Sequence, residues 1–381
     1  MPDPLRVSLL TAKMSPAAGG LSVSVPGLAH GLDVFEDVEM YVLGTQDPMD
    51  PAAANKWGPR VHAFRSSAPS ALQRAPAMAL ALERLAPDVV DVQGLWSWSS
   101  KVSLQHWRRH RKPYVVTPRG MLDPWARRNS AWKKKLFAAV VETEHLRNAF
   151  CIRATAEMEA QHFRNIGLYA PIAIVPNAIS ISELAPRRKS HRRQALFLSR
   201  IHPKKGVDVL LHAWAKLEDR NPDWDLVIAG IDENGHESAL KVLARRLKLQ
   251  RVDFVGPKHG SEKEALYRNS DLFVLPTHAE NFGLVIAEAL AQELPVITTT
   301  NAPWSGLRDM GCGWWIPPGN TKLAEAMEEA MRQPNHKLRA MGTRGRAWIQ
   351  ESFDPRQVAA KMREVYLWTA SRAARPEYVY S

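Results

Sequence analysis

One segment in the second half of the chain decides the fold: Leu272-Phe-Val-Leu-Pro-Thr-His-Ala-Glu-Asn-Phe-Gly-Leu-Val-Ile-Ala-Glu-Ala-Leu-Ala-Gln292. Its first four residues are an apolar run, which is typical of a buried strand, and residues 284–292 have the apolar density of a packed helix. A polar loop joins the two. A strand that passes through a short loop into a helix is the building unit of a parallel sheet covered by helices.

The same unit recurs along the chain. Short runs rich in Val, Ile and aromatic residues alternate with longer segments of helical periodicity. The predicted strands are 6–10, 38–43, 61–64, 89–92, 114–117, 150–154, 172–175, 195–199, 225–229, 252–255, 272–275 and 296–299. The predicted helices are 70–85, 98–110, 131–148, 155–166, 206–217, 236–247, 261–268, 284–292, 320–332, 336–350 and 355–374. This alternation predicts an α/β protein with doubly wound sheets.

The length of 381 residues suits two domains better than one. The alternation breaks once, in the polar and basic segment 179–193, which we interpret as a linker. The sequence therefore predicts one domain over 1–178 and a second over 194–354, followed by a C-terminal segment, 355–381, that is mostly helical. In such sheets ligands bind beyond the carboxyl ends of the strands, so the loops that follow strands hold the candidate site residues.

The charge is unevenly distributed. The formal net charge is +12, and residues 101–135 contain eleven Lys and Arg against Asp123 alone. A basic excess indicates an anionic partner. No apolar run is long enough to span a bilayer, the N-terminus resembles a first strand more than a signal peptide, and two cysteines suit a reducing compartment. We expect a cytoplasmic protein, peripheral on the inner face of the cell membrane.

Two loops of the second domain can bind a diphosphate. Arg200 follows a predicted strand and Lys205 precedes a helix, so a guanidinium fork and a point charge converge on one turn. A solvated charged turn is the alternative. In the decisive segment, the amides at the start of the helix form an anion site. Glu280 precedes that helix, and Glu288 lies about one turn inside it, about 6–8 Å from its start. This is about the distance from a diphosphate to a ribose, whose hydroxyls can donate hydrogen bonds to a carboxylate.

These residues resemble those of the family 4 retaining glycosyltransferases of the GT-B fold. The resemblance rests on Glu280 and Glu288, which follow Arg200 and Lys205 along the chain. Bacterial surface-polysaccharide members of the family are also similar in three short runs: Thr117-Pro-Arg-Gly-Met-Leu-Asp-Pro-Trp125, Ala154-Thr-Ala-Glu157 and Val175-Pro-Asn-Ala178. The resemblance implies two Rossmann-like domains that face a cleft. The first would be the acceptor side, the second would bind the nucleotide sugar, and the C-terminal helix would cross back to the first.

The resemblance also implies roles. Arg200 and Lys205 would hold the diphosphate, Glu288 the ribose, and Glu280 hydroxyls of the donor sugar. A UDP- or GDP-linked donor would serve as substrate, with no metal and no other cofactor. The loop with Gly19 and Gly20 would approach the reacting centre from the first domain, where paired glycines let a backbone come close to a ligand. Sugar and phosphate would lie against the amides of four consecutive residues: Asn281, Phe282, Gly283 and Leu284.

Two positions depart from the family pattern. Relatives carry histidine where this chain has Arg119 and Gln93. We treat Gln93 as a substrate-binding candidate and Arg119 as a catalytic one. Arg119 would then read a charged donor group such as a uronic carboxylate. The alternative is a drifted residue that faces solvent or acceptor.

Three further patterns carry weaker hypotheses. Asp223-Trp-Asp225 matches an Asp-x-Asp metal motif but stands at the start of a strand. His106 and His110 have i,i+4 spacing, yet their neighbours are basic. We therefore favour a solvated basic helix over a metal site. For the basic segment 101–135 with its tryptophans, we favour contact with an anionic membrane or a lipid diphosphate. A solvated basic face and binding to nucleic acid are the less favoured alternatives.

Taken together, the residues and the resemblance predict retaining, metal-independent transfer of a hexose to a polysaccharide or lipid-linked glycan. The main alternative is a non-catalytic, membrane-associated or nucleotide-sugar-binding protein with the same fold. The second alternative is a sugar-nucleotide epimerase or phosphorylase on a related two-domain scaffold.

Overall fold

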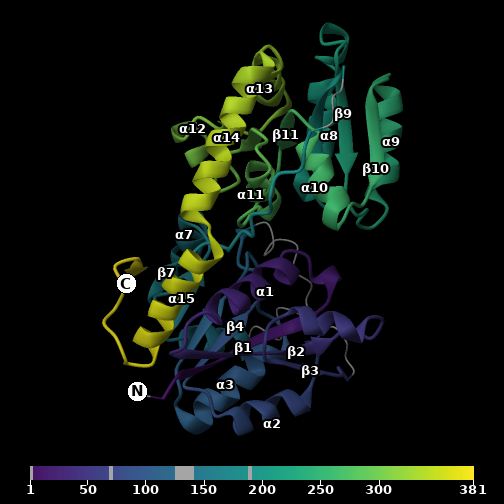
Figure 1. The fold of residues 1–381 in the computed structure, drawn as a ribbon. Helices are drawn as coiled ribbons and strands as arrows, with labels where there is room; N and C mark the ends of the chain where they lie inside the picture. The colour runs from purple at the N-terminus through teal and green to yellow at the C-terminus, as the bar shows by residue number, and fades with distance from the viewer. Residues whose placement is uncertain (1–2, 68–71, 125–140, 188–190) are drawn as a thin grey trace. The chain divides into compact units, whose positions relative to one another are not determined.

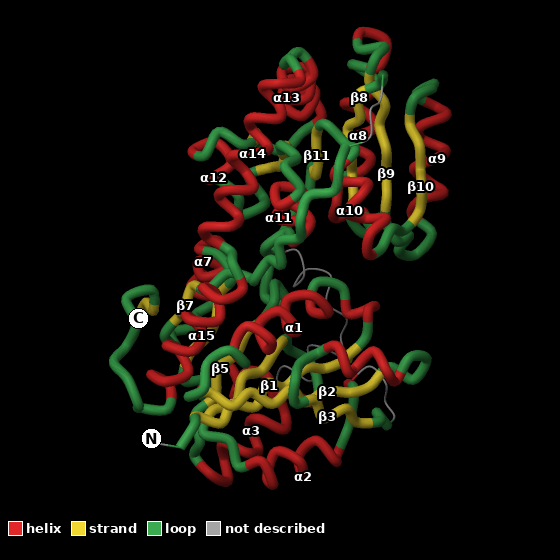
Figure 2. Tube along the Cα trace, in the orientation of Figure 1, coloured by secondary structure: helices red, strands yellow, loops and turns green. Residues whose placement is uncertain are grey.

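The computed structural model describes residues 3–67, 72–124, 141–187 and 191–381. The chain divides into two compact units. Unit 1 comprises Met1–Ser180 and Phe353–Ser381, and unit 2 comprises Ile181–Ser352. Each unit has one sheet with helices on it, as Figures 1 and 2 show. The predicted doubly wound α/β class is confirmed.

Unit 1 is built on an eight-stranded sheet of order β14-β7-β6-β5-β4-β1-β2-β3. All neighbouring strands are parallel except β14, which runs antiparallel to β7. The elements are β1 (Leu5–Met14), α1 (Leu21–Leu32), β2 (Val38–Gln46), β3 (Val61–Phe64), α2 (Pro76–Leu85), β4 (Val89–Gln93), α3 (Trp98–His110), β5 (Tyr114–Thr117), α6 (Thr143–Arg147), β6 (Cys151–Ala154), α7 (Glu157–Asn165), β7 (Ile172–Ile174), α15 (Pro355–Thr369) and β14 (Val379–Tyr380).

Two apolar clusters cover the two faces of this sheet. Side chains of α1 and α15 join alternate residues of the strands, such as Leu5, Val7 and Leu9 of β1, in one cluster. Helices α2, α3, α6 and α7 cover the other face, where Val90 and Val92 of β4 belong to the second cluster. Because successive residues of a strand point to opposite faces, a strand buried on both is apolar throughout. This explains the continuous apolar runs in the sequence.

Unit 2 has a six-stranded, fully parallel sheet of order β10-β9-β8-β11-β12-β13. Helix α13 packs against α8, and α14 packs against α11. The elements are β8 (Arg193–Leu198), α8 (Val207–Trp214), β9 (Trp224–Ala229), α9 (His236–Arg246), β10 (Val252–Gly256), α10 (Gly260–Arg268), β11 (Leu272–Leu275), α11 (Leu284–Ala291), β12 (Val296–Thr299), α12 (Gly306–Asp309), β13 (Gly313–Ile316), α13 (Asn320–Met331) and α14 (Asn335–Ser352).

The expected elements differ from the structure in a few places. Strands β13 and β14 were not expected: β13 has only four residues and starts at a glycine, and β14 has two. The helix expected over 355–374 ends at Thr369, because the chain reverses at Ser371, which has a φ of 58°. Most of the helix expected over 131–148 lies outside the described residues, and α6 covers its end.

Candidate functional site

The strand order of unit 2 places two of the predicted loops side by side. The chain moves outward from β8 to β9 and β10, then returns to the other side of β8 with β11. In parallel sheets ligands bind where the order reverses, beyond the carboxyl ends of the strands. At this point the loop after β8 carries Arg200 and Lys205, and the loop after β11 carries Glu280. The two candidate loops therefore flank the switch point of unit 2.

Direct contacts join these two loops. The carbonyl of Lys204 accepts hydrogen bonds from the His278 amide, at 2.8 Å, and from the Thr277 hydroxyl, at 3.1 Å. Gly206 has a φ of 71°, and a Cβ built on it would stand 2.2 Å from the carbonyl oxygen of Pro276. Only glycine allows this approach. The turn before α8 is therefore held against the loop that leads to α11.

Lys205 and Glu280 form an ion pair between the loops. The side chains are 9% and 12% exposed, so both charges are largely removed from water. Burial by itself would raise the pKa of Glu280, but the charge of Lys205, together with Lys204, outweighs it and holds that pKa below its ordinary value. The sequence predicted both residues in the site but did not predict that they bind each other.

The predicted cradle at the start of α11 has a defined backbone. Gly283 precedes the helix with a φ of 83°, and a Cβ on it would come within 3.0 Å of the Glu280 side chain. Phe282 is buried, and its carbonyl accepts a hydrogen bond from the indole of Trp304. The amides at an α-helix N-terminus have no partners within the helix, so they can bind an anion. Of the residues predicted to form the cradle, Gly283 is the N-cap and Leu284 the first residue of α11, and Asn281 and Phe282 directly precede them.

Glu288 has two partners on α10. One carboxylate oxygen accepts from the ammonium of Lys263 at 2.6 Å, and the other accepts from the hydroxyl of Tyr267 at 3.0 Å. The carboxylate is therefore not simply solvated. Burial and the neighbouring Glu288 charge raise the pKa of Tyr267, so the phenol stays a donor. A carboxylate oxygen can accept more than one hydrogen bond, so these contacts leave room for a hydroxyl ligand.

Arg200 is the more exposed of the two cations that were predicted to bind the diphosphate. Its guanidinium contacts both carboxylate oxygens of Glu233, at 2.9 and 3.2 Å, and its side chain is 56% exposed. It follows β8 directly, as predicted, and it is free to rotate toward a ligand at small cost because exposed ion pairs contribute little.

Unit 1 has a switch point of its own, between β1 and β4. The loop after β1 contains Gly19 and Gly20, both exposed, immediately before α1. Gly19 has a φ of 63°, and nothing lies within 4 Å of the position its Cβ would take. Gln93 is the last residue of β4, next to β1 in the sheet. The structure thus brings the predicted first-domain residues to one edge of the sheet.

Gln93 and Arg119 contact each other. The amide oxygen of Gln93 accepts from Nε of Arg119 at 2.8 Å and from a terminal nitrogen of the same guanidinium at 2.5 Å. Arg119 also donates to Asn177. Burial and the like charge of Arg153 lower the pKa of Arg119. The two departures from the family pattern, which the sequence presented as separate, are therefore one coupled pair.

Sequence reasoning missed a group of buried charges behind this pair. Asp91 of β4 is fully buried and accepts from the hydroxyl of Tyr366 on α15 at 2.6 Å. Glu159 accepts from the amides of Thr155 and Gly120, each at 2.8 Å. Burial raises the pKa of both carboxyl groups. An aspartate within the apolar run Val89-Val-Asp-Val92 was the one available signal.

The weaker patterns have structural explanations. Asp225 accepts two hydrogen bonds from Arg192, each at 2.6 Å, at the amino end of β9, away from the switch point. The prediction that His106 lies on a solvated basic face is wrong, because α3 packs against α2 and leaves His106 only 5% exposed.

The basic segment 101–135 is partly neutralised where the structure describes it. The ion pairs join Arg108 to Glu144, Arg109 and His110 to Glu83, and Lys112 to Asp88. Residues 125–135 of the segment, including two tryptophans, lie outside the described residues.

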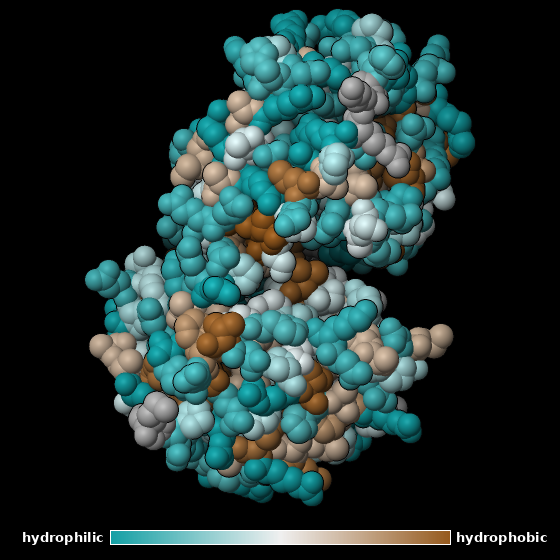
Figure 3. Space-filling view, in the orientation of Figure 1, coloured by the Kyte–Doolittle hydropathy of each residue, from teal (hydrophilic) through white to brown (hydrophobic). Residues whose placement is uncertain are grey.

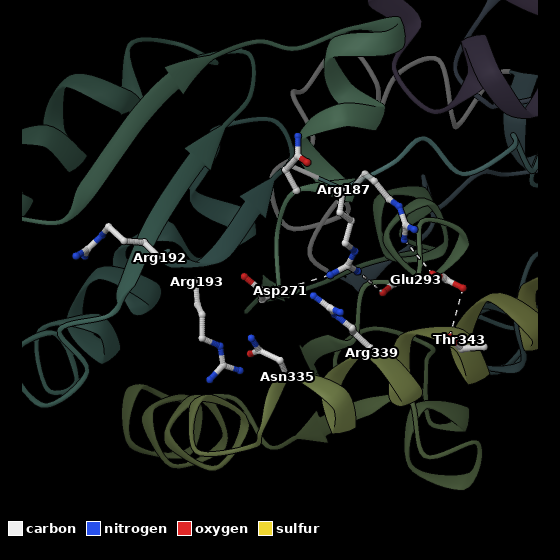
Figure 4. A pocket seen from close by; sticks show the side chains of 10 residues that line it. Arg187, Arg192, Arg193, Asp271, Glu293, Asn335, Arg339 and Thr343 are labelled. Carbon is white, nitrogen blue, oxygen red and sulfur yellow. Dashed lines mark hydrogen bonds and ion pairs between the residues drawn. The ribbon is translucent and has the colours of Figure 1, made fainter. Parts of the chain in front are cut away.

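The amino ends of the unit 2 strands border a different hollow, shown in Figure 4. This cavity of about 600 Å³ is lined by five arginines and two acids. Arg193 donates to the carbonyls of Met331 and Gln333, while Arg268 pairs with Glu293. Because it lies at the strand ends opposite to the switch-point loops, it is separate from the candidate donor site.

Both halves of the chain match known families. Residues 19–178 match the model described as glycosyl transferase 4-like domain, and residues 183–348 match glycosyl transferases group 1. A phosphatidyl-myo-inositol mannosyltransferase of Mycobacterium leprae is 30% identical over 210 residues, 53% of this chain and 54% of that protein. The chain thus spans about half or less of the length of the curated relatives first found.

Solved structures share the fold over almost the whole chain. Sucrose-phosphate synthase from Thermosynechococcus elongatus aligns with a TM-score of 0.79 at 19% identity, covering 97% of this chain and all of the other. Anabaena Alr3699/HepE, solved with UDP and glucose, aligns with a TM-score of 0.74 at 18% identity, covering 95% and 99%. The chain has the GT-B fold. The matches of both halves to glycosyl transferase domain models agree with this fold.

Helices able to cross a bilayer are absent from the described part of the chain, since none combines the needed length with enough apolar residues. Hydrophilic residues cover most of the face drawn in Figure 3.

The Lys205–Glu280 pair generates a stability prediction. Lys205→Met leaves a buried carboxylate without its cation and should cost about 3–5 kcal/mol at neutral pH. Since the folded-state pKa of Glu280 is depressed, the pair stabilises the fold above the unfolded pKa and loses this contribution as the pH falls through the folded one. The deficit of the variant should therefore shrink in acid.

Urea unfolding at a series of pH values measures this deficit. Lys216→Met, an exposed lysine on the same unit, is the matched control and should change little. A deficit that is equal at neutral and acidic pH would contradict the assignment.

Proposed function

We propose that this protein transfers a hexose from a nucleoside-diphosphate sugar to a polysaccharide or lipid-linked glycan, with retention of configuration and without a metal ion. The observation that carries the proposal is the joined pair of loops at the switch point of unit 2. They hold Lys205, Glu280 and the N-terminus of α11 within one small region. That combination suits a diphosphate next to a sugar.

Catalysis would depend on charge. As the glycosidic bond breaks, negative charge develops on the leaving diphosphate, and Arg200, Lys205 and the amides before α11 stabilise it. Lys205 can serve Glu280 and a phosphate together, because an ammonium has three donors. Glu280 would accept hydrogen bonds from donor-sugar hydroxyls, and Glu288 from the ribose.

Unit 1 would bind the acceptor. Its exposed Gly19–Gly20 loop and the Gln93–Arg119 pair stand at the switch-point edge of its sheet. In a retaining transfer of this kind, the acceptor oxygen attacks the face that the leaving group vacates and passes its proton to the departing phosphate. The similarity to a mannosyltransferase supports a hexose, and the fold shared with a protein solved with UDP and glucose supports UDP; UDP- and GDP-linked hexoses are the donors to test first.

The leading prediction concerns metal and charge. Transfer from UDP-glucose or GDP-mannose should survive EDTA, whereas Arg200→Ala and Lys205→Ala should each lower kcat/KM by about 100-fold or more, since each removes a charge from the transition state. Product formation by mass spectrometry measures it. Arg192→Ala, at the amino end of the same sheet, is the control and should retain activity. Loss of transfer in EDTA would refute metal independence.

Arg119 is the proposed reader of a charged donor group. Because Gln93 holds its guanidinium, the two residues should act as a unit in a double-mutant cycle. We expect Arg119→His to shift donor preference from a uronic acid nucleotide toward neutral sugars, and Gln93→His to lose much of its own effect in the Arg119→His background. Competition between UDP-glucuronic acid and UDP-glucose measures the shift. An unchanged preference in all three variants would refute the role.

A non-catalytic nucleotide-sugar-binding protein is the second candidate, favoured by the contact between Gln93 and Arg119 that occupies part of the guanidinium. It shares the binding residues but forms no product, so the assay above separates the two.

We further propose that residues 101–135 contact an anionic surface on the inner face of the cell membrane. The support is two cation–aromatic pairs on α3 and its C-cap residue: Lys101 lies 4.6 Å from the ring centre of Trp98, and Arg111, the C-cap, lies 4.7 Å from that of Trp107. Such amphipathic pairs suit a membrane interface.

Binding to vesicles tests this contact. Lys101→Gln with Arg111→Gln should weaken binding to phosphatidylserine-containing vesicles, measured by sedimentation, by about 30-fold, because each basic residue contributes about 1 kcal/mol near such a surface. Arg356→Gln with Lys361→Gln on α15 removes the same charge elsewhere on unit 1 and should have a smaller effect. Equal losses in the two double variants would contradict a specific surface.

A further inference from the structure

Three side chains that the proposed reaction does not use converge on the helical layer of unit 1. Glu83 lies near the end of α2, and His106 and His110 lie one turn apart near the end of α3. One imidazole nitrogen from each histidine and one carboxylate oxygen all lie within 4.8 Å of one another. The ring centres of the histidines are 4.7 Å apart.

His106 is the unusual member of this cluster. It is 95% buried, and neither ring nitrogen has a hydrogen-bond partner among the described residues; Nδ1 lies 3.5 Å from a carboxylate oxygen of Glu83. A buried polar group without a hydrogen bond is unfavourable unless something else binds it.

The other two side chains present complementary donors. Nε2 of His110 lies 2.6 Å from Glu83. Two imidazoles and one carboxylate are a common ligand set for zinc, in which a water completes the coordination.

We propose that Glu83, His106 and His110 form a zinc-type metal site that ties α2 to α3. The site takes a late first-row divalent cation, because imidazole nitrogen binds Zn²⁺ far better than it binds Mg²⁺ or Ca²⁺. The i,i+4 spacing directs both histidines to one side of α3, and the packing of α3 on α2 supplies the acid. The site shares no residue with the candidate donor site and stands independently of the proposed function.

One neighbouring charge opposes the cation. Arg109 lies 3.5 Å from Glu83, and its side chain is 70% exposed. It competes for the same carboxylate and repels a metal. Its removal should therefore tighten metal binding, an effect opposite in sign to the removal of a ligand and one that a general loss of stability does not produce.

Calorimetric titration of the EDTA-stripped, dialysed full chain with ZnCl₂ tests the site. We expect one Zn²⁺ per chain, with no comparable binding of Mg²⁺. Glu83→Gln and His110→Ala should weaken the affinity by more than about tenfold, since even the outer partners of a metal contribute that much. Arg109→Ala should strengthen it. His30→Ala, an exposed histidine on α1, is the matched control and should leave the affinity unchanged.

Thermal unfolding provides a second measurement. Zn²⁺ should raise the Tm of the natural chain, because a ligand that binds only the folded state stabilises it, and the shift should vanish in His110→Ala, whose side chain is 38% exposed. The proposal is overturned if Glu83→Gln and His110→Ala bind Zn²⁺ as the natural chain does, or if the natural chain shows no stoichiometric binding.

Discussion

The close approach of Gly206 to the carbonyl of Pro276 is the constraint on which the candidate donor site depends. A distance of 2.2 Å from a hypothetical Cβ means that no side chain fits there. The turn before α8 is thereby pressed onto the loop after β11, and Lys205 meets Glu280. Both charges can be buried because each neutralises the other, and a diphosphate would find the cation already in place.

Unit 1 also buries charged side chains, and it buries a larger group of them. Asp91, Arg119, Arg153 and Glu159 bring buried charge to the carboxyl ends of the central strands. Backbone amides, carbonyls and the Tyr366 hydroxyl satisfy many of their donors and acceptors. Charges buried at such an edge are costly, and their cost is offset where hydrogen bonds hold them in one arrangement. Arg119 therefore belongs to a network and is not a lone side chain facing the ligand.

The unit 2 sheet shows which strands and site residues can be predicted from residue patterns. Strands at 272–275 and 296–299 were predicted with the bounds that the structure has, because four consecutive apolar or β-branched residues buried on both faces leave a clear signal. β13 was missed, since Gly313-Trp-Trp-Ile316 has neither alternation nor length. Among the site residues, Lys205 and Glu280 were predicted from their places after strands, but their partners were not.

The sequence by itself determined the strand–loop–helix units, their division into two halves and the loops that carry charge. These are local properties, set by periodicity and turn residues within a few positions of the chain. Only the tertiary structure decided which residues meet: Lys205 with Glu280, Gln93 with Arg119, Glu83 with His106. Those pairs join residues 23 to 75 positions apart in the chain, where strand order and helix packing, and no local pattern, set the distance.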